Sequence, residues 1–179
     1  MLNVNTFKSK IIEKGGILDN NRFKVILPQI DGSALTGEDL NLFCISVDMP
    51  GRQITTQPRR IGLKEEKVAD GFLVDDVNIS FYMPADGSIK QYFETWAQKA
   101  VLNVQGRIGY KVDYQKNVII QQLKRDESVS HQVLLREAFP TSLQAIELSS
   151  ETTNQLSRYS VQLSYTDFLP SRPALEAAI

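Results

Sequence analysis

Few residues in this sequence have the types and spacing that catalysis requires. The 179-residue chain carries one cysteine, Cys44, and one histidine, His131, the minimum for a nucleophile with its general base. Both residues fall in segments whose pattern predicts strands, and the sequence suggests no third group that would orient the histidine. We therefore predict that Cys44 packs in the interior and that His131 lies on the surface. A single cysteine and a single histidine also exclude an internal disulfide and the usual kind of zinc site.

Pairs of charged residues are more numerous than cysteine and histidine, but the sequence around them predicts that they are exposed to solvent. The carboxylate pairs at 65–66 and 75–76 would need a cleft that separates their pKa values before they could act as acid and base. The arginine pair at 59–60 lies beside acids, which weakens its case as a phosphate contact. The glycines at 15–16 and 106–109 lack the Lys-Ser/Thr pair of a phosphate-binding loop. We expect no enzyme, no metal site and no cofactor.

Composition and charge narrow the class of protein further. With 20 Lys and Arg against 21 Asp and Glu, the formal net charge is −1, which excludes a strongly basic nucleic-acid binder and gives little attraction to anionic membranes. Hydrophobic residues make up 42% of the chain, enough for a core, and the length suits one domain over residues 1–179. Neither a signal peptide nor an apolar run of about 18 residues is present. We expect a soluble chain without a secretion signal.

The elements that position these residues begin with a helix and two strands. Phe7 and the isoleucines after it recur at helical spacing before the glycine pair at 15–16, so a short helix is expected there. Alternating apolar residues predict strands over 22–28 and 41–50, each closed by a proline. The intervening segment, 29–40, has the glycines and polar residues of turns.

Residues 51–76 form a long polar segment that interrupts this alternation. Its front half is basic, with five basic against two acidic residues from 52 to 67, and its end is acidic. It is either a solvated hairpin whose charges maintain solubility or an arm that docks on another subunit, and the sequence alone does not choose. The charged residues that would make docking contacts are Arg52, Arg59, Arg60, Lys64, Lys67, Asp70, Asp75 and Asp76.

The best-defined helix follows a strand expected over 77–84. Ser88 and Gln91 have the spacing of a capping box, in which each side chain satisfies a backbone N–H at the start of a helix. The residues after Ser88 form an apolar stripe at i, i+3, i+4 and i+7 spacing. The stripe consists of Ile89, Tyr92, Phe93, Trp96 and Ala100. We predict that this helix packs against a sheet and does not form a ligand site.

The second half of the chain is predicted to be β-structure. Strands are expected over 117–126 and 130–140 as a hairpin, and the last strand, over 156–168, alternates between an apolar face and an uncharged polar face. Residues 140–155 are interpreted as a turn followed by a polar loop. The tail, 169–179, has two prolines and is expected to be peripheral.

These elements together predict a mainly β (α+β) fold. Five or six antiparallel strands would form a β-sandwich or a partly open barrel with one core α-helix and a short N-terminal helix. The residues expected in the core are Phe23, Val25, Phe81, Phe93, Trp96, Tyr159, Val161 and Leu163.

Four segments occur in an order that resembles the tail tube protein family of T-even-like contractile bacteriophages. They are the strand that ends in D-M-P-G, the helix that ends in F-E-T-W, the segment A-F-P-T-S-L-Q-A-I-E-L and the closing strand Y-S-V-Q-L-S-Y. No single segment is specific, and the resemblance rests on their order from residue 5 to residue 168.

The resemblance implies hexameric rings that stack into a tube, whose inner β-barrel surrounds a channel. DNA and the tape-measure protein would pass through the channel, without specific binding of the DNA, and the tail sheath protein would surround the tube. Further partners would be other copies of the chain and a baseplate tube-initiator, in a phage tail that is assembled in the host cytoplasm. The resemblance also implies that residues 51–76 lie at contacts between subunits and rings. We hypothesise that this arm is mobile in the monomer and ordered on assembly.

Three other interpretations stay open at this stage. A baseplate tube-initiator or adaptor of the same fold would share these segments. A monomeric β-sandwich that binds a ligand would show an aromatic cluster on its loops, whereas the aromatic residues here lie mostly in predicted strands and the helix. A hydrolase would need an acid–base set in a cleft, and none is found. The tail after Phe168 is longer than the family requires, which leaves the sheath contacts open.

Overall fold

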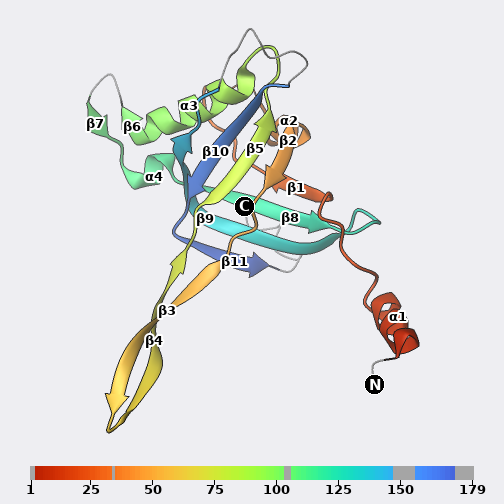
Figure 1. Cartoon of the computed structure of the whole chain (residues 1–179). Helices are drawn as coiled ribbons and strands as arrows, with labels where there is room; N and C mark the ends of the chain where they lie inside the picture. The colour runs from red at the N-terminus through yellow and green to blue at the C-terminus, as the bar shows by residue number, and fades with distance from the viewer. Residues whose placement is uncertain (1–2, 34, 103–105, 147–155, 172–179) are drawn as a thin grey trace.

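One antiparallel sheet forms the body of the molecule (Figure 1). The computed structural model describes residues 3–33, 35–102, 106–146 and 156–171. The sheet has seven strands in the order β1-β8-β9-β10-β5-β2, with β11 paired to β9. Its strands are β1 (Phe23–Ile26), β2 (Cys44–Val47), β5 (Val77–Tyr82), β8 (Lys116–Leu123), β9 (Val129–Leu143), β10 (Arg158–Ser164) and β11 (Asp167–Ser171). With its helices, this open sheet confirms the predicted mainly β (α+β) fold.

Helices and two smaller strand pairs complete the described part of the chain. The helices are α1 (Val4–Glu13), α2 (Gly37–Leu42), α3 (Ser88–Ala100) and α4 (Lys111–Tyr114). The strand pairs are β3 (Arg52–Ile61) with β4 (Lys64–Val74), and β6 (Val101–Leu102) with β7 (Arg107–Ile108). None of the helices in these described residues has the length and hydrophobicity to cross a membrane.

Strand β9 joins the two halves of the sheet. Its first part pairs with β8 on one side and β11 on the other, and its last residues pair with β10. At the junction Glu137 has a φ of 56°, and the register against β8 shifts between Lys116 and Val118. Such irregularities bend a strand. The chain therefore turns here from one half to the other, and the two halves cross steeply (Figure 1).

The core lies between the sheet and α3. The stripe on α3 is buried from Ile89 to Trp96, and Ala100 at its end is half-buried. Among the residues expected in the core, those at most 1% exposed are Val25, Phe81, Phe93, Trp96, Tyr159, Val161 and Leu163. Phe23, on the edge strand β1, is half-buried and packs against this core.

Helix α3 begins without the predicted capping box. Its N-cap residue is Gly87, in a left-handed conformation with a φ of 67° and with no side chain to cap the helix. Instead, the Oδ1 of Asp86 accepts hydrogen bonds from the backbone N–H of Ser88 at 3.0 Å and from its hydroxyl at 2.7 Å. The pairing of Ser88 with Gln91 is therefore a wrong prediction, because a local turn at Asp86 uses the serine.

The predicted turn between the first two strands contains a helix, α2. The Oγ1 of its N-cap residue, Thr36, accepts from the backbone N–H of Asp39 at 3.4 Å, and the Oδ2 of Asp39 accepts from the backbone N–H of Thr36 at 3.1 Å. This is a capping box that the sequence analysis missed. Because α2 continues to Leu42, β2 begins only at Cys44, and the strand predicted over 41–50 begins too early.

Two boundaries near the C-terminus also differ from the prediction. The turn predicted from residue 140 is strand, because β9 continues to Leu143 against β10. The first residues of the 169–179 tail belong to β11, which pairs with β9 at the sheet edge, so they are not peripheral. The remainder of the predicted loop, 147–155, and of the tail, 172–179, lies outside the described residues.

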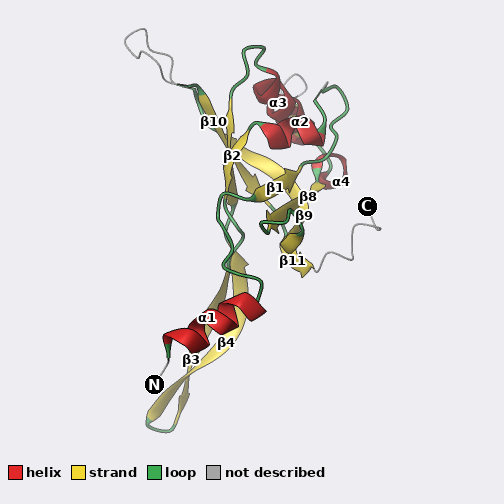
Figure 2. Cartoon of the chain, turned by 90° about the vertical axis from the view of Figure 1, so that its right-hand side faces the viewer, coloured by secondary structure: helices red, strands yellow, loops and turns green. Residues whose placement is uncertain are grey.

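Two elements project from the same end of the body. The β3–β4 hairpin and α1 both extend beyond the sheet, and they lie on opposite flanks in Figure 1. In the view turned by 90° they lie at the same height and overlap (Figure 2). No residue of α1 is buried. Both elements therefore offer surfaces that the rest of the described chain does not cover.

Candidate assembly surfaces

The predicted arm, 51–76, is a long antiparallel hairpin (Figures 1 and 2). Strands β3 and β4 pair along their full length, and Gly62 and Leu63 form the turn between them. Gly62 has a φ of 64°, a conformation that two-residue hairpin turns favour. Nearly every side chain is exposed, and Leu63 at the tip is 97% exposed. Because its side chains are exposed, the hairpin has surface available for a partner. A partner would also stabilise it, since an isolated two-stranded hairpin is only marginally stable.

The outer half of the hairpin carries cations that form no ion pair with another described residue. They are Arg59, Arg60, Lys64 and Lys67, all exposed. Glu66 lies opposite Arg59, and Glu65 lies opposite Arg60, across the two strands. Although their positions are complementary, these side chains extend into solvent and stay available for charges on another molecule.

The base of the hairpin is tied to the sheet by Arg52. Its Nη2 donates to Oδ1 of Asp167 at 2.8 Å. Its guanidinium carbon lies 4.6 Å from the ring centre of Phe72, on β4, and 4.8 Å from that of Phe168, on β11. A cation between two aromatic rings is stabilised by each ring face. Arg52 was expected to contact another subunit, but the structure uses it inside the chain.

The acidic residues predicted for docking lie toward the base of the hairpin. Asp70 lies where β4 has one residue more than β3, at the register shift between Thr55 and Thr56. Asp75 and Asp76 form the connection to β5, and both are exposed. The Tyr165 hydroxyl donates to the Asp75 carbonyl oxygen at 2.8 Å and so fixes this connection. The hairpin is therefore basic toward its tip and acidic at its base.

A second candidate surface is the exposed face of the central strands. Ser80 on β5 and Ser160 on β10 lie opposite each other, with their hydroxyl oxygens 2.9 Å apart in a hydrogen bond. The other side chains on this face are Ser46, Asn78, Tyr82, Arg158, Gln162 and Ser164. Arg158, opposite Tyr82, is the one cation among them, and near the other end of the face the Asp48 carboxylate accepts from Nδ2 of Asn78 at 3.0 Å. The opposite face of β5 and β10 is buried in the core. The middle of the exposed face is thus polar without a charged side chain, and charges lie only toward its two ends.

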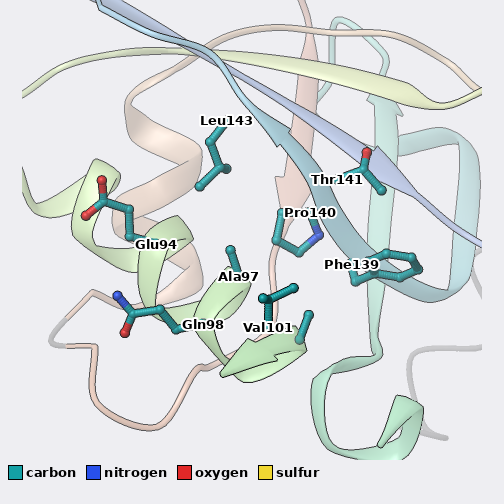
Figure 3. A pocket seen from close by; sticks show the side chains of 9 residues that line it. Glu94, Ala97, Gln98, Val101, Phe139, Pro140, Thr141 and Leu143 are labelled. Atoms are coloured by element: carbon teal, nitrogen blue, oxygen red, sulfur yellow. The ribbon is translucent and has the colours of Figure 1, made fainter. Parts of the chain in front are cut away.

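A groove of about 780 Å³ lies between α3 and the end of β9 (Figure 3). Its lining is mostly apolar and consists of Ala97, Ala100, Val101, Phe139, Pro140 and Leu143, with Glu94, Gln98 and Thr141 as polar members. One carboxylate and two neutral polar groups do not make an acid–base pair. The groove therefore offers surface for contact but no catalytic centre.

The residues considered as nucleophile and base lie on different parts of the sheet. Cys44 is in the edge strand β2 and His131 is in β9, with β5 and β10 between them. Cys44 is half-buried, and this burial raises the pKa of its thiol to about 12, which keeps the thiol protonated and unreactive. His131 is exposed. In the described residues, no group of three or more His, Cys, Asp or Glu side chains could hold a metal ion.

Sequence analysis missed the long-range contacts that fix these surfaces. One such set is the contacts of Arg52 described above. In a second set, the Glu137 carboxylate accepts hydrogen bonds from the Lys111 ammonium and from the Thr166 hydroxyl, the latter at 2.7 Å. The Lys111 ammonium is the main reason why the pKa of Glu137 is lowered. No local sequence pattern predicts such contacts, because the residues that form them lie far apart in the chain.

Comparisons with known proteins give one family and several similar structures. A family model described as phage tail tube protein matches residues 6–171. A chain of the anti-feeding prophage (AFP) baseplate is similar with a TM-score of 0.62 and 16% identity, covering 89% of this chain and 98% of that chain. A chain of the PVC sheath/tube terminator of an extracellular contractile injection system has a TM-score of 0.63 and 16% identity, covering 87% of this chain and 97% of that chain.

A chain of the PVC sheath-tube complex in the extended state has a TM-score of 0.58 and 17% identity, covering 91% of this chain and 96% of that chain. No curated protein sequence matches this one. At such identities the solved structures establish a shared fold and nothing more.

Proposed function

Because the chain belongs to the phage tail tube protein family and is thus a structural component of a phage tail, we propose that six copies form a ring and that rings stack into the tail tube. The observation that carries this proposal is the family match over nearly the whole chain, residues 6–171. Two of the similar structures come from a 6-fold symmetrised baseplate and from a sheath-tube complex, which supports the ring and the tube.

The polar face of β5 and β10, whose middle carries no charged side chain, lines the channel in this proposal, and α3 lies on the outer side. DNA carries one negative charge about every 1.7 Å of helix axis, so a basic channel wall would bind it and an acidic wall would repel it. The hydroxyl groups of Ser80 and Ser160 do neither. DNA and the tape-measure protein would then pass without specific binding, and the sheath protein would contact the outer surface.

The β3–β4 hairpin makes the contacts between subunits and between rings. The four cations of its outer half reach carboxylates on an adjacent copy, and the hairpin, mobile in the monomer, becomes ordered when it docks. Each exposed charge pair contributes only about 0–1 kcal/mol, so several must act together. Assembly takes place in the host cytoplasm, and the chain has no catalytic role.

A tube-initiator or tube-terminator role is the second candidate. It is favoured by the similarity to chains from a baseplate and from a sheath/tube terminator. Negative-stain microscopy of the purified full-length protein separates the two candidates. Long hollow fibres support the repeating tube subunit, and single rings support the initiator or terminator. A monomer that forms neither at high protein concentration overturns both.

Charge reversal tests the role of the hairpin. The triple variant Arg59→Glu, Arg60→Glu and Lys64→Glu should abolish stacking while the far-ultraviolet circular dichroism spectrum stays that of the wild type. Raised salt should weaken wild-type stacking in the same direction, because it screens exposed charges.

The matched control reverses three exposed cations elsewhere, Lys90, Arg107 and Lys124, and so adds the same negative charge. The control should still form tubes. Full-length tubes from the hairpin variant, with unchanged salt sensitivity, would show that the hairpin is only a solvated element.

A further inference from the structure

Helix α1 is amphipathic but has no packing partner in the described part of its own chain. Val4, Phe7 and Ile11 follow one another at i, i+3 and i+7 spacing, and Ile12 borders this stripe. Val4 is 65% exposed, Phe7 57% and Ile12 77%. An apolar stripe of this kind normally packs against another surface. Since α1 has no buried residue, the described part of the chain leaves this stripe open to a second molecule.

The C-terminal end of α1 is capped, and the segment after it contacts the body. The backbone N–H groups of Gly15 and Gly16, both with positive φ, donate to the carbonyl oxygens of the last helical turn. Three residues later, the Oδ2 of Asp19 accepts from Nε of Arg125 at 3.1 Å, in the turn between β8 and β9. The helix therefore starts from a segment that lies against the β8–β9 turn.

The hairpin carries a second apolar surface that the described part of its own chain leaves open. Ile54 on β3 lies directly opposite Phe72 on β4, so the two side chains share one face of the hairpin. Ala69 lies on the same face. Ile54 is 63% exposed and Phe72 is 51% exposed, although Arg52 covers part of the Phe72 ring.

The two apolar surfaces lie where neighbouring copies would bring them together. In Figure 1 the hairpin and α1 occupy opposite flanks of the same end of the molecule. In Figure 2, after a quarter turn, they overlap at the same height, so the separation between them runs mainly along the horizontal axis of Figure 1. A second copy displaced along that axis would place its hairpin against α1 of the first. A contact between two different surfaces of this kind builds a closed ring when the rotation that relates successive copies closes, as it does in the proposed hexamer.

Charge favours the same pairing. The helix and its first following residue carry Lys8, Lys10 and Lys14 against one acid, Glu13. The base of the hairpin, next to its apolar face, carries the exposed carboxylates at 70, 75 and 76. A basic helix would therefore approach an acidic rim around an apolar centre, the usual composition of a specific interface.

We infer that the apolar stripe of α1 in one copy packs on the apolar face of the β3–β4 hairpin of the next copy in the same ring, with Phe7 against Ile54 and Phe72. This inference rests on the proposed ring assembly and specifies the contact that closes it. The hairpin thus has two separate tasks. Its inner half receives a helix from a neighbour in the ring, while its charged outer half is free for stacking.

Cysteine cross-linking tests the contact directly. In a Cys44→Ala background, the variant with Phe7→Cys and Ile54→Cys should form disulfides between copies under mild oxidation. Denaturing gels should then show a ladder that ends at the hexamer, because each ring closes on itself. The control with Thr6→Cys and Ile54→Cys has its helix cysteine off the apolar stripe, about 100° around α1 from Phe7, and should stay monomeric on the gel.

The outcomes separate this inference from the proposed function. A wild type that forms no rings overturns the proposed ring assembly, and the inference with it. Rings in the microscope without a ladder on the gel overturn the inference alone. A ladder that continues beyond the hexamer also overturns it, because α1 would then join one ring to the next.

A paired substitution on α1 gives an independent readout. Phe7→Glu places a charge in the apolar stripe and should lower the yield of rings at least tenfold, whereas Thr6→Glu adds the same charge outside the stripe and should leave the yield unchanged. Both variants should melt at the wild-type temperature at a concentration where the protein is monomeric, because α1 has no buried residue. Equal ring yields from the two variants contradict the proposed contact.

Discussion

Replacing Trp96 tests how much of the stability depends on the packing of α3 against the sheet. The Trp96 side chain is 0% exposed. Its ring stacks on Phe93 with the ring centres 6.4 Å apart, and meets Tyr92 edge to face at 6.1 Å. Its Nε1 donates to the carbonyl oxygen of Tyr114 at 2.7 Å, which ties α3 to α4. Trp96→Ala removes all three contacts, whereas Trp96→Phe keeps a ring and removes the hydrogen bond.

The expected losses of stability follow from these contacts. Truncation of a buried Trp to Ala costs about 3–5 kcal/mol, because a cavity replaces the ring. Loss of the indole hydrogen bond in Trp96→Phe leaves a carbonyl oxygen without its donor, at a cost of about 1–2 kcal/mol. For a chain of this size the dependence of the unfolding free energy on urea is about 3 kcal/mol per molar. The urea midpoint should therefore fall by about 1.5 M for Trp96→Ala and about 0.5 M for Trp96→Phe.

Urea unfolding should be followed by far-ultraviolet circular dichroism at a protein concentration where the wild type is monomeric. Trp96 is the only tryptophan, so fluorescence reports the wild type but not the variants. An Ala variant whose midpoint lies within 0.3 M of the wild type, a shift of about 1 kcal/mol or less, would refute the packing of α3 against the sheet. An Ala variant no less stable than the Phe variant would refute the cavity as the main cause.

Two further predictions concern single side chains. Cys44→Ala and His131→Ala should leave tube formation and phage infectivity unchanged, since the two residues lie on separate strands and cannot act as nucleophile and base together. Loss of tubes from a folded His131→Ala protein would contradict this. Glu137→Gln should destabilise the monomer above about pH 5 but not at acid pH. Folding lowers the pKa of this carboxyl, chiefly because of the Lys111 ammonium. The contribution of the carboxylate to the free energy of unfolding is therefore present above the unfolded pKa and is lost as pH falls through the folded pKa. A difference in urea midpoint between wild type and Glu137→Gln that does not shrink from pH 7 to pH 3 would show that the ion pair does not contribute.

Elements with one buried face could be predicted from the sequence because burial leaves a periodic pattern. In β10 the buried residues Tyr159, Val161 and Leu163 alternate with polar ones, and the stripe of α3 repeats at helical spacing. These signals are local. The patterns extend over seven residues in β10 and thirteen in α3, long enough to be distinguished from an accidental repeat of apolar residues.

Elements whose formation depends on distant contacts could not be predicted in the same way. Helix α2 has six residues with one buried side chain, Leu40, too little for a periodic pattern. Its Asn41 accepts at Oδ1 from the backbone N–H of Val25 at 2.8 Å, a contact between helix and edge strand that only the folded chain brings together. Strand β11 contains Pro170, which suggests a break, but an edge strand tolerates a residue without an N–H.

The candidate surfaces were predicted in part. Charge patterning singled out the segment 51–76, which the structure shows as an exposed hairpin. Its docking on another subunit stays a prediction, and charge patterning grouped Arg52 with the cations of the outer half. Arg52 instead contacts Asp167 and Phe168, more than 100 residues away. Charge alone cannot distinguish a free cation from one between two aromatic rings. The apolar residues Ile54 and Phe72 become a surface only when the register of β3 against β4 is known.

The link between the hairpin and the body determines how the molecule bears mechanical load. Only Asp75 and Asp76 separate β4 from β5, and β5 lies inside the sheet between β10 and β2. A pull on the hairpin would therefore enter the body along β5, and along β2 through residues 48–51. Hydrogen bonds of an antiparallel pair run perpendicular to the strands, so such a pull would shear all the bonds of β5 at once and would not peel them apart one by one. In the proposed tube, a load on the hairpin would thus meet the strongest direction of the sheet.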